Sequence, residues 1–147
     1  MAHTFVKDVM KKDLVTVDSS KSIKDAASLM NSEDVGCVIV TKENAPVGIL
    51  TERDFVKRIA AEEKQLSESV DKVMSSPLIS VKPDDTVWDA AEIMKVKNIH
   101  KVPVQDGNDI VGIVTATDLV KICSVGSDSE MRRICDQILL RMQENPN

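Results

Sequence analysis

The chain of 147 residues is long enough for one compact domain or for two small repeats that share a core. Hydrophobic residues make up 42% of it and charged residues 29%, as in ordinary soluble globular proteins. A net charge of −5 and an aromatic share of 2% argue against a general nucleic-acid or anionic-membrane surface and against the aromatic platforms of single-strand binders.

The cysteines and the lengths of the apolar runs indicate in which cellular compartment the protein is expected. No apolar run approaches the roughly 20 residues of a membrane span, and the first residues lack the charged-then-apolar pattern of a signal peptide. Cys37, Cys123 and Cys135 are far apart and form no C-x-x-C pair. We therefore expect reduced thiols and a cytoplasmic location.

Short strands and helices alternate along the first half of the chain. Ser22 and Asp25 have the spacing of a capping box, and either Ser20 or Ser22 opens a helix whose apolar residues recur at helical spacing from Ile23 to Met30. The expected elements are a lead-in helix over 4–10, a strand over 14–17, this helix, two paired strands over 36–41 and 47–51, and a helix over 52–61.

The second half repeats this order at an offset of 64 residues, which carries Gly48 onto Gly112. Residues that are identical in this register include Val9/Val73, Met10/Met74, Asp25/Asp89, Met30/Met94 and Val40/Val104. The matching elements are a lead-in over 70–74, a strand over 78–81, a helix opened near Asp84, a hairpin over 101–115 and a helix from about 116. Each copy is thus β-α-β-β-α. A unit of about 60 residues is marginal alone, so we expect an α+β fold in which the two copies pack face to face with pseudo-twofold symmetry.

Residues 127–143 continue the chain beyond the second copy. Their apolar residues, from Met131 to Met142, recur at helical spacing and predict an amphipathic helix capped by Ser127 or Asp128. Two readings stay open: the helix folds back on its own domain, or it contacts a dimer mate or another partner. The expected division is repeat 1 over 4–62, a connector over 63–69, repeat 2 over 70–124 and this helix.

The duplicated motif runs Gly48-Ile-Leu-Thr-Glu-Arg-Asp54 and Gly112-Ile-Val-Thr-Ala-Thr-Asp118. A threonine followed three residues later by an aspartate is a common helix cap, so one copy alone would indicate only a cap. Two copies at equivalent strand-to-helix junctions favour a ligand site. A glycine lets a ligand approach the backbone, helix N–H groups suit a phosphate, and a carboxylate can accept both ribose hydroxyls.

The tandem β-α-β-β-α copies, each ending in G-h-h-T-x-x-D (h, hydrophobic), resemble the cystathionine β-synthase (CBS) domain pair, or Bateman module. The paired Val-x-x-Val-Met lead-ins and the strand Lys101-Val-Pro-Val104 resemble it too, and the likeness covers about residues 4–124. The resemblance implies two clefts between the repeats that bind adenosine-containing ligands such as AMP, ADP, ATP or S-adenosylmethionine. It also implies that Asp54 and Asp118 hold the ribose and that Thr51 and Thr115 lie near the phosphates.

By the same resemblance, each cleft takes residues from both repeats. The first joins Thr51, Arg53 and Asp54 to Ser80, Val81, His100 and Lys101. The second joins Thr115 and Asp118 to Thr16, Val17, Gly36, Cys37 and Val38. Because charged donors make the stronger hydrogen bonds to phosphate, the arginine, histidine and lysine of the first cleft favour it for a phosphorylated nucleotide. His100 can instead be structural, and Cys37 is more simply a core thiol.

The sequence thus predicts a sensor that binds adenine nucleotides as regulatory ligands. Catalytic residues, metal-ligand clusters and cofactor motifs are absent from the sequence, so we expect no enzyme activity. The rival reading is a structural or interaction protein with vestigial clefts that acts through its C-terminal helix; a weaker rival is an enzyme site completed by that helix. We also expect a homodimer through the helices at 52–61 and 116–124, which carry Phe55, Ile59, Leu119, Val120 and Ile122. An unidentified protein target is a further expected partner.

Overall fold

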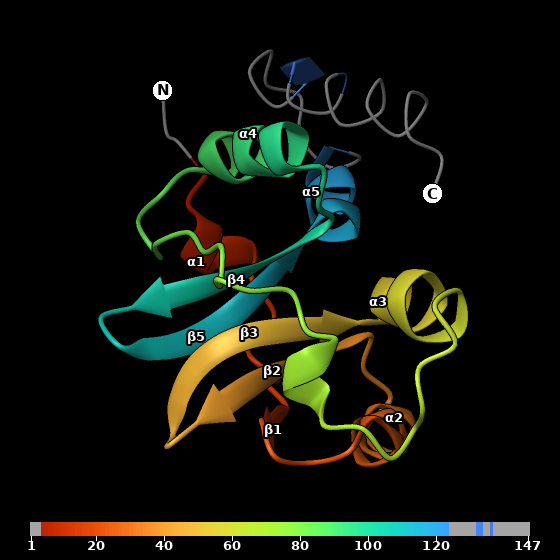
Figure 1. Cartoon of the computed structure of the whole chain (residues 1–147). Coiled ribbons are helices and arrows are strands. Elements are labelled where there is room, and N and C mark those ends of the chain that lie inside the picture. The colour runs from red at the N-terminus through yellow and green to blue at the C-terminus, as the bar shows by residue number, and fades with distance from the viewer. Residues whose placement is uncertain (1–3, 124–131, 134–135, 137–147) are drawn as a thin grey trace. The chain divides into compact units, whose positions relative to one another are not determined.

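The computed structural model describes residues 4–123, 132–133 and 136 (Figure 1). The chain divides into two compact units. Residues 13–79 form one, called here the first-motif unit because it contains Thr51 and Asp54. The described residues among 1–12 and 80–147 form the other, the second-motif unit, which contains Thr115 and Asp118.

The first-motif unit is a three-stranded sheet that shares its core with helical elements. The strand order is β1-β2-β3, with β1 parallel to β2 and β2 antiparallel to β3. Its elements are β1 (Thr16–Asp18), α2 (Ile23–Glu33), β2 (Cys37–Lys42), β3 (Ala45–Thr51), α3 (Glu52–Asp54), the π-helical η1 (Phe55–Ala60) and the 3₁₀ turn η2 (Val70–Lys72).

The second-motif unit is built around the antiparallel hairpin of β4 (Lys101–Asp106) and β5 (Asp109–Thr115). Its helices are α1 (Val6–Val9), α4 (Val87–Lys97) and α5 (Ala116–Cys123). The expected strand over 78–81 is reduced to a single parallel bridge between Val81 and Val104. Gly107, at φ +63°, makes the hairpin turn, a conformation that glycine adopts without strain.

Each unit has its own aliphatic core. The buried residues of the first-motif unit are Val17, Ile23, Ala26, Met30, Val38, Val40, Leu50, Ile59, Val70 and Val73. Those of the second-motif unit are Val6, Val81, Val87, Ala90, Ala91, Met94, Val102, Val104, Val114, Ala116 and Leu119. Both lists follow the apolar spacing of the sequence, and the expected α+β class is confirmed.

The two lead-ins fold with the opposite repeat. Val6 of α1, which precedes the first copy in the sequence, lies in the core of the second-motif unit. Val70 of η2, which precedes the second copy, lies in the core of the first-motif unit. The folded units are therefore cut near residues 12 and 79, whereas the sequence repeats begin at the lead-ins.

Local signals explain where the long helices begin. Ser22 caps α2, since its Oγ accepts from the Asp25 N–H at 3.0 Å and its own N–H donates to Asp25 Oδ2 at 3.3 Å. Thr86 caps α4 in the same way with Asp89. The helix predicted to open near Asp84 thus begins at Val87 instead, because Thr86 supplies the cap.

Two expectations about surface helices change. The helix predicted over 52–61 is α-helical only through Asp54 and π-helical beyond it. Ile59 and Leu119, expected on an exposed dimer face, are 4% and 1% exposed because they fill their own unit's core. The predicted helix over 127–143 lies outside the described residues apart from 132–133 and 136. Every helix among the described residues is too short or too polar to cross a bilayer.

Candidate functional site

The first motif places Asp54 at the junction of β3 and α3. Its Oδ2 accepts hydrogen bonds from the Thr51 N–H at 2.9 Å and from Thr51 Oγ1 at 3.2 Å. Its Oδ1 lies 3.6 Å from Nε of Arg58, one helical turn further on. Asp54 is 8% exposed, so the cap and the guanidinium together offset the cost of burying its charge.

The second motif repeats this geometry with a different cation. Asp118 Oδ2 accepts from the Thr115 N–H at 3.1 Å, and the Asp118 N–H donates to Thr115 Oγ1 at 3.1 Å. Asp118 Oδ1 lies 3.6 Å from Nζ of Lys11, and the residue is 7% exposed. Asp54 and Asp118 are the two buried charged or polar residues in the described part of the chain.

Both motifs are therefore helix caps, as the capping interpretation of the sequence predicted. Capping does not, however, explain why the two aspartates are buried. The exposed box of Thr86 and Asp89 shows that a cap needs no buried carboxylate. Burial of Asp54 and Asp118 adds a cost that capping alone does not require. Each carboxylate keeps Oδ2 in the cap and turns Oδ1 toward a side-chain cation.

The motif glycines do not provide an opening for a ligand. A Cβ on Gly48 would lie 2.6 Å from Sδ of Met74, and one on Gly112 would lie 2.5 Å from Sδ of Met10. The space is filled by the methionine of the lead-in, which also brings its backbone close to the strand. The expectation that these glycines admit a ligand was wrong, because the glycine accommodates lead-in packing.

Other predicted residues of the first-motif unit lie beside its motif or along the same sheet. Cys37 pairs with Thr51 across β2 and β3, and the Gly36 carbonyl accepts from the Glu52 N–H at 3.1 Å. Val38 is buried opposite Leu50. The two predicted residues of β1 pair with β2 further along: Thr16 is exposed opposite Ile39, and Val17 is buried opposite Val40. Arg53 is half-buried next to Asp54.

The second-motif unit shows the same pattern. Lys101 pairs with Thr115, and the His100 carbonyl accepts from the Ala116 N–H at 2.9 Å. Ser80 and Val81 lie beside the hairpin turn, at the opposite end of β5 from Thr115. The structure thus brings each motif together with the β2 or β4 start of its own repeat. The expected grouping of residues from both units stays a prediction.

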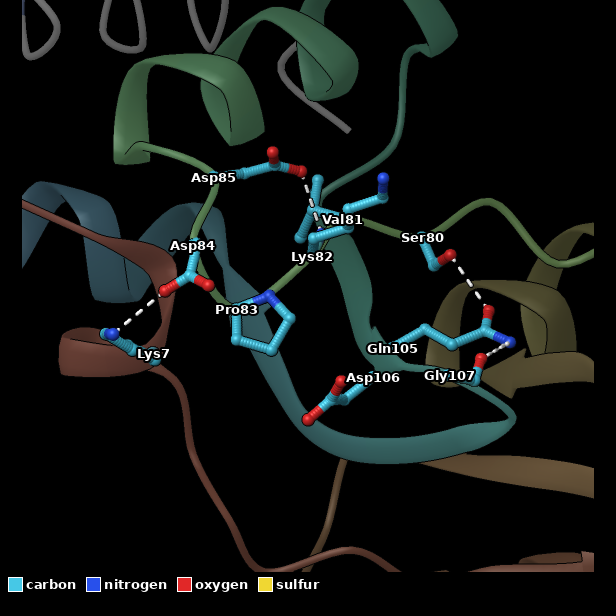
Figure 2. Close-up of a pocket in the computed structure, with 10 residues that line it drawn as sticks. All are labelled: Lys7, Ser80, Val81, Lys82, Pro83, Asp84, Asp85, Gln105, Asp106 and Gly107. Carbon is cyan, nitrogen blue, oxygen red and sulfur yellow. Dashed lines mark hydrogen bonds and ion pairs between the residues drawn. The ribbon is translucent and has the colours of Figure 1, made fainter.

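A surface hollow of about 820 Å³ lies at this turn end of the second-motif unit (Figure 2). Ser80 Oγ donates to Gln105 Oε1 at 3.0 Å on one side, and Lys7 Nζ pairs with Asp84 Oδ1 at 2.8 Å on the other. The hydrogen bond to Asp84 raises the pKa of Lys7 above its ordinary value. The hollow contains Ser80 and Val81 but neither His100 nor Lys101, and its mixed charges favour no anion.

Sequence reasoning missed the two cations beside the aspartates. Arg58 could have been found, since it follows Asp54 at the i, i+4 spacing of helical ion pairs. Lys11 could not, because 107 positions separate it from Asp118 and only the fold brings them together. Among the described residues no group of three or more His, Cys, Asp or Glu side chains could hold a metal ion.

Comparison with known proteins gives consistent matches. The CBS domain family model matches residues 6–61 and 70–124. The CBS domain-containing protein YhcV of Bacillus subtilis (strain 168) is 37% identical over 114 residues, which cover 78% of this chain and 81% of that protein. The uncharacterized protein MJ1404 of Methanocaldococcus jannaschii is 33% identical over 135 residues, 82% of this chain, and the chain spans 32% of its length.

A solved structure adds the fold. The CBS domain pair of protein MJ0100, in complex with 5'-methylthioadenosine and S-adenosyl-L-methionine, has a TM-score of 0.75 at 30% identity. The match covers 84% of this chain and 98% of that one. Two family matches in tandem, a relative similar over most of its length and the duplicated G-h-h-T-x-x-D motif agree. The chain belongs to the CBS domain family and carries a tandem pair of CBS domains.

Proposed function

We propose that this CBS pair is a regulatory module that binds adenosine-containing ligands, namely AMP, ADP, ATP or S-adenosylmethionine, and has no catalytic residues of its own. The observation that carries the proposal is the pair of buried aspartates, each with one oxygen in a cap and the other turned toward a cation. The adenosyl ligands of the MJ0100 domain pair support the choice of ligand class.

In this proposal Asp54 and Asp118 accept the ribose hydroxyls, and Thr51 and Thr115 lie near the phosphates. Each charged acceptor bond contributes about 1.5–3 kcal/mol, so the carboxylate dominates nucleoside affinity. Arg53, His100 and Lys101 would favour a phosphorylated ligand in the first site. The remaining proposed contacts are Ser80 and Val81 there and Thr16, Val17, Gly36, Cys37 and Val38 in the second, less charged site.

The signal would be a small rigid shift of the units and not refolding, because a ligand biases an equilibrium only by its differential contacts with the two states. A cytoplasmic homodimer acting on an unidentified protein target completes the proposal. Ile59 and Leu119 are buried and therefore cannot contribute to the proposed dimer interface. Val56 of η1, 67% exposed, is a large apolar residue on the surface of the first-motif unit.

The test is calorimetric titration of AMP and ATP into wild type, Asp54→Ala and Asp118→Ala. Asp54→Ala should weaken nucleotide binding at the first site tenfold or more, since about 1.4 kcal/mol is one decade. Asp118→Ala should leave that phosphate-dependent binding nearly intact.

Asp89→Ala is the matched control, because Asp89 closes the same kind of box with Thr86 but is exposed. It should lose about 0.5–2 kcal/mol of stability and no ligand affinity. Unimpaired nucleotide binding by Asp54→Ala would reduce the motif to a helix cap. Absence of any nucleotide binding, with a partner captured through residues 127–143, would favour the interaction protein.

A further inference from the structure

The two motif aspartates share a feature that capping does not explain: each Oδ1 faces a cation that is tied to a lead-in segment. The lead-in segments are taken here with the residues that directly follow them, through Lys12 in the first and through Ser75 in the second. Lys11 thus belongs to the N-terminal lead-in segment, and its Nζ lies 3.6 Å from Asp118 Oδ1. Arg58 lies 3.6 Å from Asp54 Oδ1 through Nε. Its Nη1 donates to the carbonyls of Met74 at 2.9 Å and Val73 at 3.4 Å, both at the end of the other lead-in.

Each lead-in is held against the motif strand by its backbone as well. Lys11 and Ile113 exchange two N–H to carbonyl hydrogen bonds, both of 2.9 Å. Ser75 and Ile49 do the same at 3.1 and 2.9 Å. The lead-in methionine covers the motif glycine in both units. Three interactions thus connect each lead-in to its motif: the backbone hydrogen bonds, the methionine packed on the glycine, and the cation. These three are called ties here, and of them the cation is the one that contacts the aspartate proposed to bind the ribose.

The sequence repeat does not predict these cations. At the 64-residue offset the position of Lys11 is occupied by Ser75, and that of Arg58 by Ile122. The first-motif unit takes its cation from the helix after the motif, and the second-motif unit takes it from the lead-in. Two different residues thus place positive charge at the same distance from the equivalent oxygen.

The ion pairs are weak enough to be displaced. The Lys11 and Arg58 side chains are 61% and 46% exposed, so water and salt screen both pairs. A separation of 3.6 Å is also longer than a charge-assisted hydrogen bond. Ribose hydroxyls, which donate directly to a carboxylate, can compete for the same oxygen.

We propose that Lys11 and Arg58 are latches: each covers Oδ1 of a motif aspartate in the unliganded protein, and a ribose that takes this oxygen releases the lead-in from that tie. The proposal rests on the proposed function and deepens it. It makes the two cations positioning residues that lower nucleoside affinity and link occupancy of the aspartate to the lead-in. A cation that supported the ligand would have the opposite effect on affinity.

Adenosine is the probe, because it has the ribose but no phosphate that a lysine could attract. Asp54→Ala silences the first-motif aspartate, and Lys11→Met is then compared with Lys12→Met in that background. Lys12 is the exposed neighbour in the same lead-in. Lys11→Met should tighten adenosine binding about two- to fivefold, the range expected for releasing an exposed ion pair, while Lys12→Met leaves binding unchanged. Lys11→Arg should restore the wild-type affinity.

The reciprocal arm uses Asp118→Ala as background and compares Arg58→Met with Lys57→Met, its exposed neighbour. Unchanged or weaker adenosine binding by both Lys11→Met and Arg58→Met would overturn the latch, with the proposed function intact. If adenosine fails to bind wild type, or binds Asp54→Ala/Asp118→Ala as well as wild type, the proposed function fails first, and the latch with it.

The amide hydrogen-exchange rates of Lys11 and Ile113 provide a second test. If Lys11 had only a structural role, adenosine would not change these rates. Saturation with adenosine should speed exchange there in the Asp54→Ala protein, since one of three ties is lost. The same addition should change nothing in Asp54→Ala/Lys11→Met, where that tie is already absent. Slower or unchanged exchange in the Asp54→Ala protein would overturn the release of the lead-in.

Discussion

Replacing Gly112 by alanine is a sharp test of how the lead-in packs on the motif strand. The new Cβ would lie 2.5 Å from Sδ and 2.8 Å from Cγ of Met10, and 3.0 Å from the Lys11 carbonyl oxygen. Real Cβ atoms do not approach other heavy atoms that closely, so Met10 must move. The side chain can rotate away, but the Lys11 backbone is fixed by its two hydrogen bonds to Ile113.

The cost can be bounded from two opposing effects. Overpacking a well-filled site costs about 1–3 kcal/mol. Restricting the unfolded chain by replacing glycine with alanine returns about 0.4–1 kcal/mol. We therefore expect Gly112→Ala to lower the free energy of unfolding by about 1–2 kcal/mol. For a chain of this size each kcal/mol corresponds to a drop of about 2–4 °C in melting temperature.

The assay is a double-mutant cycle with Met10→Ala, measured by chemical and thermal unfolding. Shortening Met10 removes the two closest contacts and leaves only the tight contact at the Lys11 carbonyl. The loss caused by Gly112→Ala should then fall by at least half, giving a coupling energy above about 0.5 kcal/mol. Gly107→Ala is the contrast: nothing lies within 4 Å of its Cβ, and its strain comes from φ of +63°. Met10→Ala should not relieve it.

Equal destabilisation by Gly112→Ala in both backgrounds would refute the reasoning, because the cost would then come from the backbone and not from Met10. A stabilised Gly112→Ala protein would refute it more strongly. That result would mean that the lead-in does not press on the motif strand.

Two further predictions concern the surface. Hydrogen bonds from the Ser20 side chain and backbone hold the pKa of Asp18 below its ordinary value, so Asp18 contributes stability that is lost as the pH falls through the acidic range. Ser20→Ala should raise this pKa in an NMR titration, and an unchanged value would contradict the bond. Trp88 is the single tryptophan, and the Arg133 guanidinium lies 5.7 Å from its ring centroid. Arg133→Ala should shift its fluorescence and cost about 0.5–1 kcal/mol, whereas an Arg132→Ala control should not; an unshifted spectrum would count against the contact.

Much of the local structure could be predicted from the sequence because its causes are local. Apolar spacing predicted the buried face of α2 around Ile23 and Met30, and the Ser22–Asp25 box predicted its cap. The duplicated Thr51 and Asp54 predicted the paired junctions, and both proved to be caps around a buried carboxylate. The resemblance to CBS pairs, carried by the same motif, is confirmed by the family match.

Only the tertiary structure decided which segments fold together. An amphipathic lead-in such as α1 has the same apolar pattern whichever unit it joins, so spacing could not reveal that Val6 packs with the second-motif unit. For the same reason the sequence could not predict that Gly112 accommodates Met10 or that Lys11 lies beside Asp118. These contacts join residues about a hundred positions apart, and the energy of such a contact depends on the distance that folding creates, not on the spacing along the chain.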